Sequence, residues 1–232
     1  MRILQFLASL PTSLYPSPSI HAQPLLSSNV SKLLTPINCL SPPPATFLEL
    51  IDCFDGYTVP ANTYRTPSEY NFAQPDEIVE RPAWNAAVDA LLAVNGNCGP
   101  DLLPHPLLNT YTITLYHEAV STPPEPGPSP RSFCILSEVQ AIGTRYRRGW
   151  GLVAVPATRA LVSRYLHISA PHPKYDLHTP QHAATVFRNT GAKSLLISGR
   201  HRNAYSSPSL CVEDPDYSVT DPTHDIVRRF HL

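Results

Sequence analysis

The sequence predicts an α/β fold: a single domain whose small mixed sheet contains a right-handed parallel βαβ unit. Two observations predict this unit. Residues 165–170 (YLHISA) and 194–198 (SLLIS) are short, mostly apolar runs, as in buried strands. Residues 180–190 between them carry apolar side chains at helical spacing. A helix that connects two neighbouring strands leaves them parallel, and such crossovers are nearly always right-handed.

The helix between these strands has its own start and stop signals. Thr179 supplies a capping hydroxyl before Pro180, whose missing N–H costs nothing in the first helical turn. Val186 and Phe187 belong to the apolar face, which we expect to pack on the sheet. Gly191 is suited to ending the helix.

The rest of the domain shows fewer clear elements. Residues 84–94 have helical spacing, while residues 109–116 and 152–155 are typical of strands. Only about nine residues separate 152–155 from 165–170, too few for a parallel crossover. We therefore expect these two strands to be antiparallel or not neighbours.

The composition excludes some classes of protein and suggests boundaries. The 232 residues carry a net charge of −1, which excludes nucleic-acid binding through a large basic excess. No stretch approaches the ~20 apolar residues of a membrane-spanning helix, so we predict no transmembrane segment. Many of the 27 prolines gather in two places. We interpret residues 23–45 as a linker, 122–131 as a surface loop and 46–232 as the domain.

The amino terminus predicts secretion. Arg2, the apolar run 3–10 and Ala22 resemble a secretory signal over residues 1–22, although a disordered terminus is the alternative. Asn29 begins a glycosylation acceptor sequence just beyond it. The five cysteines form no C-x-x-C pair, and an oxidising compartment would allow two disulfides and one free thiol. The sequence leaves their pairing open.

Polar residues follow both strands of the βαβ unit. In open α/β sheets, ligand sites lie beyond the carboxyl ends of the strands. Neighbouring strands lie ~4.8 Å apart, so histidines from the two loops can approach one small volume. The polar residues of these loops are His172, Asp176, His178, Arg200, His201 and Arg202.

Imidazole and carboxylate groups at one edge favour a zinc-dependent hydrolase. We predict His172, His201 and His224 as zinc ligands, with Asp176 as a fourth ligand or general base. His178 and His182 would support the ligands. In an alternative mechanism without a metal, His172 and Asp176 would carry out acid–base catalysis.

The two arginines predict an anionic substrate. Arg200 and Arg202 are alternate residues, so only one of them need face the cleft, where it would hold a carboxylate or phosphate of the substrate. The substrate would be an amide or ester, either a small molecule or a peptide. The sequence contains no H-E-x-x-H motif, no G-x-S-x-G elbow and no phosphate-binding glycine loop. A non-catalytic secreted protein that binds a small anion or a partner is therefore the main alternative. An inactive, truncated homologue is another alternative. The chain ends soon after His224, whereas an enzyme of this design would normally continue with a helix or strand that covers the sheet.

Three segments of the second half carry a resemblance. Residues 171–183 (PHPKYDLHTPQHA), 187–196 (FRNTGAKSLL) and 199–204 (GRHRNA) resemble a group of predicted extracellular fungal proteins without a settled activity. The similar stretch covers about residues 149–231. The resemblance implies that the two loops form one site, and it implies no substrate.

Overall fold

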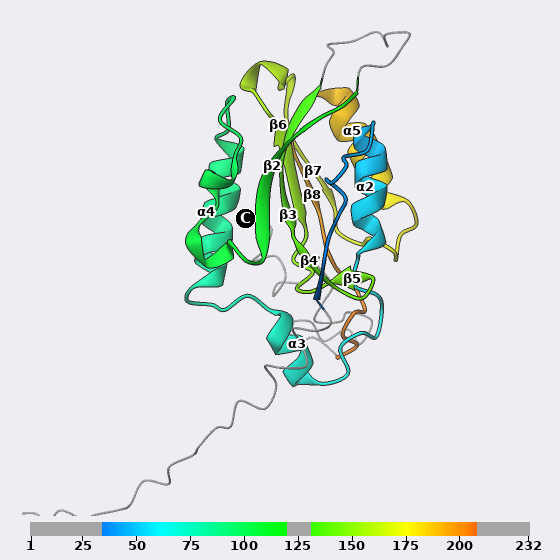
Figure 1. Cartoon of the computed structure of the whole chain (residues 1–232). Helices are drawn as coiled ribbons and strands as arrows, with labels where there is room; N and C mark the ends of the chain where they lie inside the picture. The colour runs from blue at the N-terminus through cyan, green and yellow to red at the C-terminus, as the bar shows by residue number, and fades with distance from the viewer. Residues whose placement is uncertain (1–33, 120–130, 208–232) are drawn as a thin grey trace, which may run out of the picture. The chain divides into compact units, whose positions relative to one another are not determined.

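A five-stranded mixed sheet organises the protein (Figure 1). The computed structural model describes residues 34–119 and 131–207. The strand order is β2-β3-β6-β8-β7, and all pairs are antiparallel except β8 and β7. The strands are β2 (Tyr111–His117), β3 (Ser132–Glu138), β6 (Leu152–Pro156), β7 (Arg164–Ala170) and β8 (Ala192–Ile197).

The predicted parallel pair is present. Strands β7 and β8 pair in parallel, and helix α5 (Thr179–Thr190) lies between them in the sequence. Strand β8 lies between β6 and β7, so these two strands are not neighbours, which was the second of the two expectations for them. The right-handed sense of the crossover stays a prediction from the general rule.

The start of α5 differs from the prediction. The cap position is occupied by His178, which adopts the left-handed conformation with φ 62°, and Thr179 is already helical. The Thr179 hydroxyl donates a hydrogen bond to the Asp176 carbonyl at 2.7 Å instead of capping the helix. The predicted end is present, because Gly191 has φ 61° and donates its N–H to the Phe187 carbonyl.

Helices cover both faces of the sheet. Helices α2 (Phe47–Gly56) and α5 pack on one face, where the ring of Phe47 lies 4.4 Å from Phe133 and 5.6 Å from Phe187 between centroids. Helix α4 (Glu80–Leu92) packs on the other face, where the ring centroids of Trp84 and Tyr111 lie 4.7 Å apart. The sheet therefore separates two apolar cores, as expected for an α/β protein.

The smaller elements lie around these layers. A second sheet has the order β1-β4-β5, with β1 (Leu34–Pro36), β4 (Gln140–Ile142) and β5 (Arg145–Tyr146). Helix α3 (Pro67–Ala73) and three 3₁₀ turns, η1 (Pro100–Leu102), η2 (His105–Leu107) and η3 (Arg159–Leu161), complete the described elements. In the described part of the chain, none of the helices has the length and apolar character needed to span a membrane.

The predicted linker overlaps the folded domain. Strand β1 pairs with β4, and Cys39 is buried and joined by a disulfide to Cys53 of α2. The domain therefore begins by Leu34 rather than at residue 46, and proline content misled the boundary because it does not prevent packing. The predicted signal 1–22, Asn29, Cys211 and almost all of the loop 122–131 lie outside the described residues.

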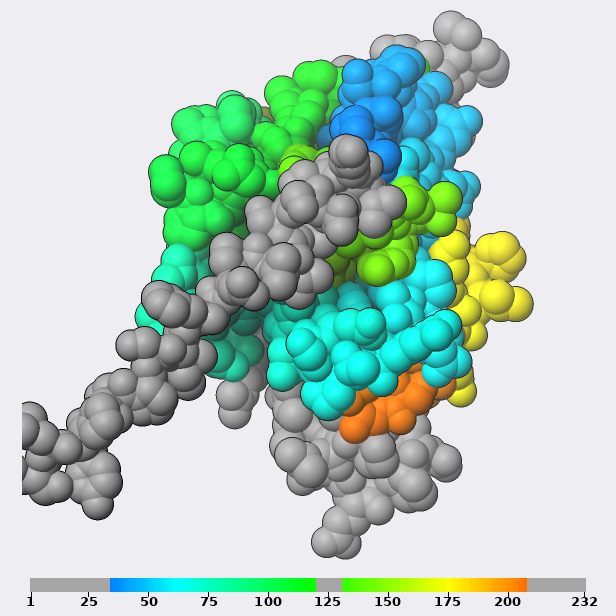
Figure 2. All heavy atoms as spheres, turned by 60° about the horizontal axis from the view of Figure 1, so that its bottom comes forward, coloured from blue at the N-terminus to red at the C-terminus, as the bar shows by residue number. Residues whose placement is uncertain are grey.

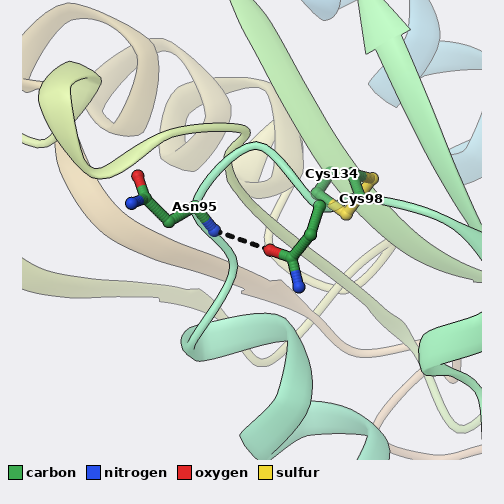
Figure 3. The surroundings of a disulfide bond; sticks show 4 residues. Asn95, Cys98 and Cys134 are labelled. Carbon is green, nitrogen blue, oxygen red and sulfur yellow. Dashed lines mark hydrogen bonds between the residues drawn. A yellow bond between two sulfur atoms is a disulfide. The ribbon is translucent and has the colours of Figure 1, made fainter.

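A second disulfide connects the segment after α4 to the sheet. Cys98, in the segment after α4, is bonded to Cys134, which is fully buried in β3 (Figure 3). The same segment turns back on itself, because the Asn95 N–H donates to the Asn97 side-chain oxygen at 2.9 Å. The disulfide thus anchors the segment that follows α4 to a central strand.

The packing of α5 gives a direct test of which side chains form the core. Phe187 is 1% exposed, but Val186 is 46% exposed, so the expectation that Val186 packs on the sheet is wrong. Consecutive residues on a helix point about 100° apart, which turns Val186 away from the buried face. We expect Phe187→Ala to cost about 3–5 kcal/mol of unfolding free energy and Val186→Asp less than about 1 kcal/mol. Denaturant unfolding measures both, and equal losses would contradict this packing.

Candidate active site at the carboxyl ends of β7 and β8

The two loops that follow β7 and β8 leave the sheet side by side. The Ser198 N–H donates to the Ala170 carbonyl at 3.1 Å, which keeps the ends of the two strands paired. Residues 171–178 and 199–204 then form the loops seen in yellow and orange in Figure 2. Their common origin brings predicted site residues from both loops together.

In the first loop, His172 and Asp176 form a hydrogen-bonded pair. The Asp176 N–H donates to the His172 carbonyl at 3.1 Å, and this turn returns the Asp176 side chain toward the imidazole. Nδ1 of His172 lies 3.0 Å from Oδ2 of Asp176. An ionised carboxylate only accepts hydrogen bonds, so Nδ1 carries the proton and, in the neutral ring, Nε2 has the lone pair.

In the second loop, backbone hydrogen bonds hold His201 in place. Its N–H donates to the Val59 carbonyl at 2.8 Å, and the Tyr64 N–H donates to the Ala204 carbonyl at 2.9 Å. The Asn203 N–H donates to Nδ1 of His201 at 3.0 Å, so the proton of the neutral ring is on Nε2. Burial lowers the pKa of His201, and the charges of Arg202 and His172 lower it further. This imidazole is therefore neutral at pH 7 and donates from Nε2.

Tyr175 connects the two loops. Its ring centroid lies 6.2 Å from that of His172 and 5.4 Å from that of His201. The guanidinium carbon of Arg202 lies 4.6 Å from the centre of the Tyr175 ring, within the range of a cation–π interaction. We call His172, Tyr175, Asp176, His201 and Arg202 the edge cluster. Sequence reasoning missed Tyr175, although its place between two residues of the same loop was a usable signal.

Arg200 lies outside the edge cluster. It is 7% exposed, and its guanidinium donates hydrogen bonds to the carbonyl oxygens of Arg148 and Ala73. These hydrogen bonds connect the second loop to the segments that contain Ala73 and Arg148. Its guanidinium is thus hydrogen-bonded to backbone carbonyls, whereas the guanidinium of Arg202 lies over the ring of Tyr175 in the first loop.

Glu138 at the end of β3 supports the same region from inside. Its carboxylate is buried and accepts hydrogen bonds from the N–H groups of Arg148 and Gly149, the latter at 2.8 Å. The pKa of Glu138 is raised to about 7, because the effect of burial outweighs the lowering by those two hydrogen bonds and by the charges of Arg200 and Arg148. Gly149 and Gly199 lie against each other, and a Cβ on Gly199 would come within 2.7 Å of the Gly149 backbone. Sequence reasoning missed Glu138, because nothing local distinguishes it from a surface residue at a strand end.

The other predicted metal and support residues are more dispersed. Among the described residues, no group of three or more His, Cys, Asp or Glu side chains is arranged to hold a metal ion. The predicted ligand His224 lies outside those residues. The side chains of His178 and His182 are exposed at the start of α5.

The comparisons with known proteins found no relatives. No family model matches the chain, and no match was found among the curated proteins or the solved structures. The resemblance to extracellular fungal proteins therefore stays an expectation.

Proposed function

We propose that this protein is a secreted hydrolase that acts on an amide or ester bearing an anionic group, with the edge cluster as its active site. The observation that carries the proposal is the hydrogen bond of 3.0 Å between Nδ1 of His172 and Oδ2 of Asp176. It lies beside a second, neutral imidazole and an arginine held over an aromatic ring.

These groups can divide the chemistry of hydrolysis between them. Nε2 of His172 takes a proton from water, and the oxygen of that water forms a bond to the substrate carbonyl carbon. Asp176 stabilises the resulting imidazolium through Nδ1. Nε2 of His201 donates a hydrogen bond to the carbonyl oxygen as it gains negative charge. His172 then gives its proton to the leaving alkoxide or amine as the bond to carbon breaks.

Arg202 supplies the preference for an anion. A guanidinium matches a carboxylate or phosphate with two parallel hydrogen bonds. The Tyr175 ring lies against it and limits its orientations. Because Tyr175 also contacts the rings of both histidines, the anionic group and the reacting carbonyl would lie next to each other.

A zinc ion held by His172, His201 and His224 remains a second form of the proposal. Zinc would lower the pKa of a bound water to about 7 and so supply the nucleophile. His201 fits this role less well than His172, because binding through Nε2 would place a proton on Nδ1, opposite the Asn203 N–H. Metal analysis of the purified protein distinguishes the zinc mechanism from the metal-free one. One zinc ion per chain that is lost in His172→Ala would support the zinc mechanism.

Secretion is part of the proposal because of the cysteines. The described residues contain two disulfides, Cys39–Cys53 and Cys98–Cys134, and disulfides persist in oxidising compartments. Amino-terminal sequencing of secreted protein is expected to begin near Gln23. An intact Met1 on cytosolic protein would remove this part of the proposal.

The test of the function compares two chromogenic esters. We expect kcat/KM for para-nitrophenyl hydrogen glutarate, which is anionic, to exceed that for neutral para-nitrophenyl butyrate by at least about tenfold. Arg202→Met should remove this preference, whereas Arg164→Met, which removes an exposed cation of β7, should keep it. Glutarate that binds at the edge cluster without turnover of either ester would instead establish the non-catalytic alternative.

A further inference from the structure

A hollow of about 270 Å³ lies at the opposite end of the sheet from the edge cluster. It is found where α4 and β6 end and where β7 and β8 begin, toward the top of Figure 1. Its lining includes the aliphatic residues Leu91, Leu92, Val94, Val155 and Val162, together with Arg159, Tyr165 and Lys193. Small-molecule sites usually combine apolar side chains with a few polar groups, and this hollow contains both.

The charges at this hollow are all positive. Arg159 and Lys193 are among its lining residues, and none of the described lining residues is a carboxylate. The Arg159 guanidinium donates to the Ala93 carbonyl at 3.4 Å, at the end of α4 where carbonyl groups concentrate partial negative charge. The charge of Arg159 therefore offsets the partial negative charge at the end of α4. This leaves Lys193 as the cation that can pair with a ligand.

We propose that this hollow is a second binding site, for a medium-chain aliphatic carboxylate. The alkyl chain would lie among the leucine and valine side chains, and the carboxylate would accept hydrogen bonds from Nζ of Lys193. Tyr165, 88% exposed at the rim, offers further apolar surface to the chain. The site takes up its ligand reversibly and does not depend on the proposed hydrolase activity, because it shares no residue with the edge cluster.

Isothermal titration of the full-length protein with octanoate tests this site, with octanamide as the uncharged counterpart. We expect saturable octanoate binding and at least about tenfold weaker binding of octanamide, since only the carboxylate forms a charge-assisted hydrogen bond. Lys193→Met keeps most of the apolar stem and should weaken octanoate binding about tenfold, whereas Lys193→Arg should keep it. Arg202→Met removes a cation at the other end of the sheet and should leave octanoate binding unchanged.

Three results would overturn the proposal. They are the absence of saturable octanoate binding at millimolar concentrations, unchanged binding by Lys193→Met, and loss of binding in Arg202→Met. The last result would assign the carboxylate to the edge cluster. Far-ultraviolet circular dichroism of each variant confirms that the fold is retained before the affinities are compared.

Discussion

Replacing Arg200 with methionine is expected to lower the free energy of unfolding by about 3–5 kcal/mol. The side chain is buried, and its guanidinium satisfies the carbonyl oxygens of Arg148 and Ala73. It also lowers the pKa of the buried Glu138 carboxylate, so its loss would leave that carboxylate with less compensating charge. Chemical denaturation measures the change, and a loss below about 1 kcal/mol would contradict the structural role of Arg200.

The pH dependence of stability gives a second readout of the same variant. Burial raises the pKa of Glu138 from 4.5 to about 7 in the folded protein. Between these values the folded state keeps a proton that the unfolded state releases, so the contribution of Glu138 to stability falls as pH rises. Without Arg200 the folded pKa is higher still, and the fall should continue above pH 7. Arg202→Met removes a cation from the same loop, but Arg202 is not among the charges that act on Glu138, so this variant should not extend the fall in stability above pH 7.

His172→Ala is expected to reduce kcat for the anionic ester by a factor of about 10²–10⁴, the usual contribution of a general base. Asp176→Asn should also reduce kcat, because an amide can donate to Nδ1 of His172 and so favour the wrong tautomer. Both variants should stay folded, since both side chains lie in a loop at the edge of the sheet. Initial-rate kinetics with para-nitrophenyl hydrogen glutarate measures the losses.

The matched control is His178→Ala. His178 lies in the same loop with an exposed side chain and is not a member of the edge cluster, so we expect kcat within about twofold of the native protein. A loss at His178 equal to that at His172 would mean that the loop as a whole, rather than the His172 imidazole, determines activity.

The sequence predicted the part of the fold that strong local patterns encode. The runs 165–170 and 194–198 and the helix between them are present because apolar periodicity and Gly191 act locally. The boundary at residue 46 failed for a tertiary reason: Cys39 is held by a disulfide to Cys53, which no composition rule detects. Val186 was misplaced because the sequence does not reveal which side of a wide apolar face meets the sheet.

The candidate site was predictable in outline but not in detail. The rule that loops follow the carboxyl ends of parallel strands placed residues 171–178 and 199–204 together. That rule does not say which way Arg200 and Arg202 point. The difference comes from the carbonyl oxygens of Arg148 and Ala73, which lie far away in the sequence. Tyr175 and Glu138 likewise gain their roles only from neighbours that folding supplies.

The most direct measurement of the central proposal is a long-range proton–nitrogen NMR spectrum of the histidine rings, recorded while glutarate is added. In the neutral rings, we expect the proton of His172 on Nδ1 and that of His201 on Nε2, because of their bonds to Asp176 and Asn203. Glutarate should shift the ring signals of both residues and leave those of His105 and His117, which lie outside the edge cluster, unchanged. A proton on Nε2 of neutral His172, or shifts confined to histidines outside the edge cluster, would contradict the account.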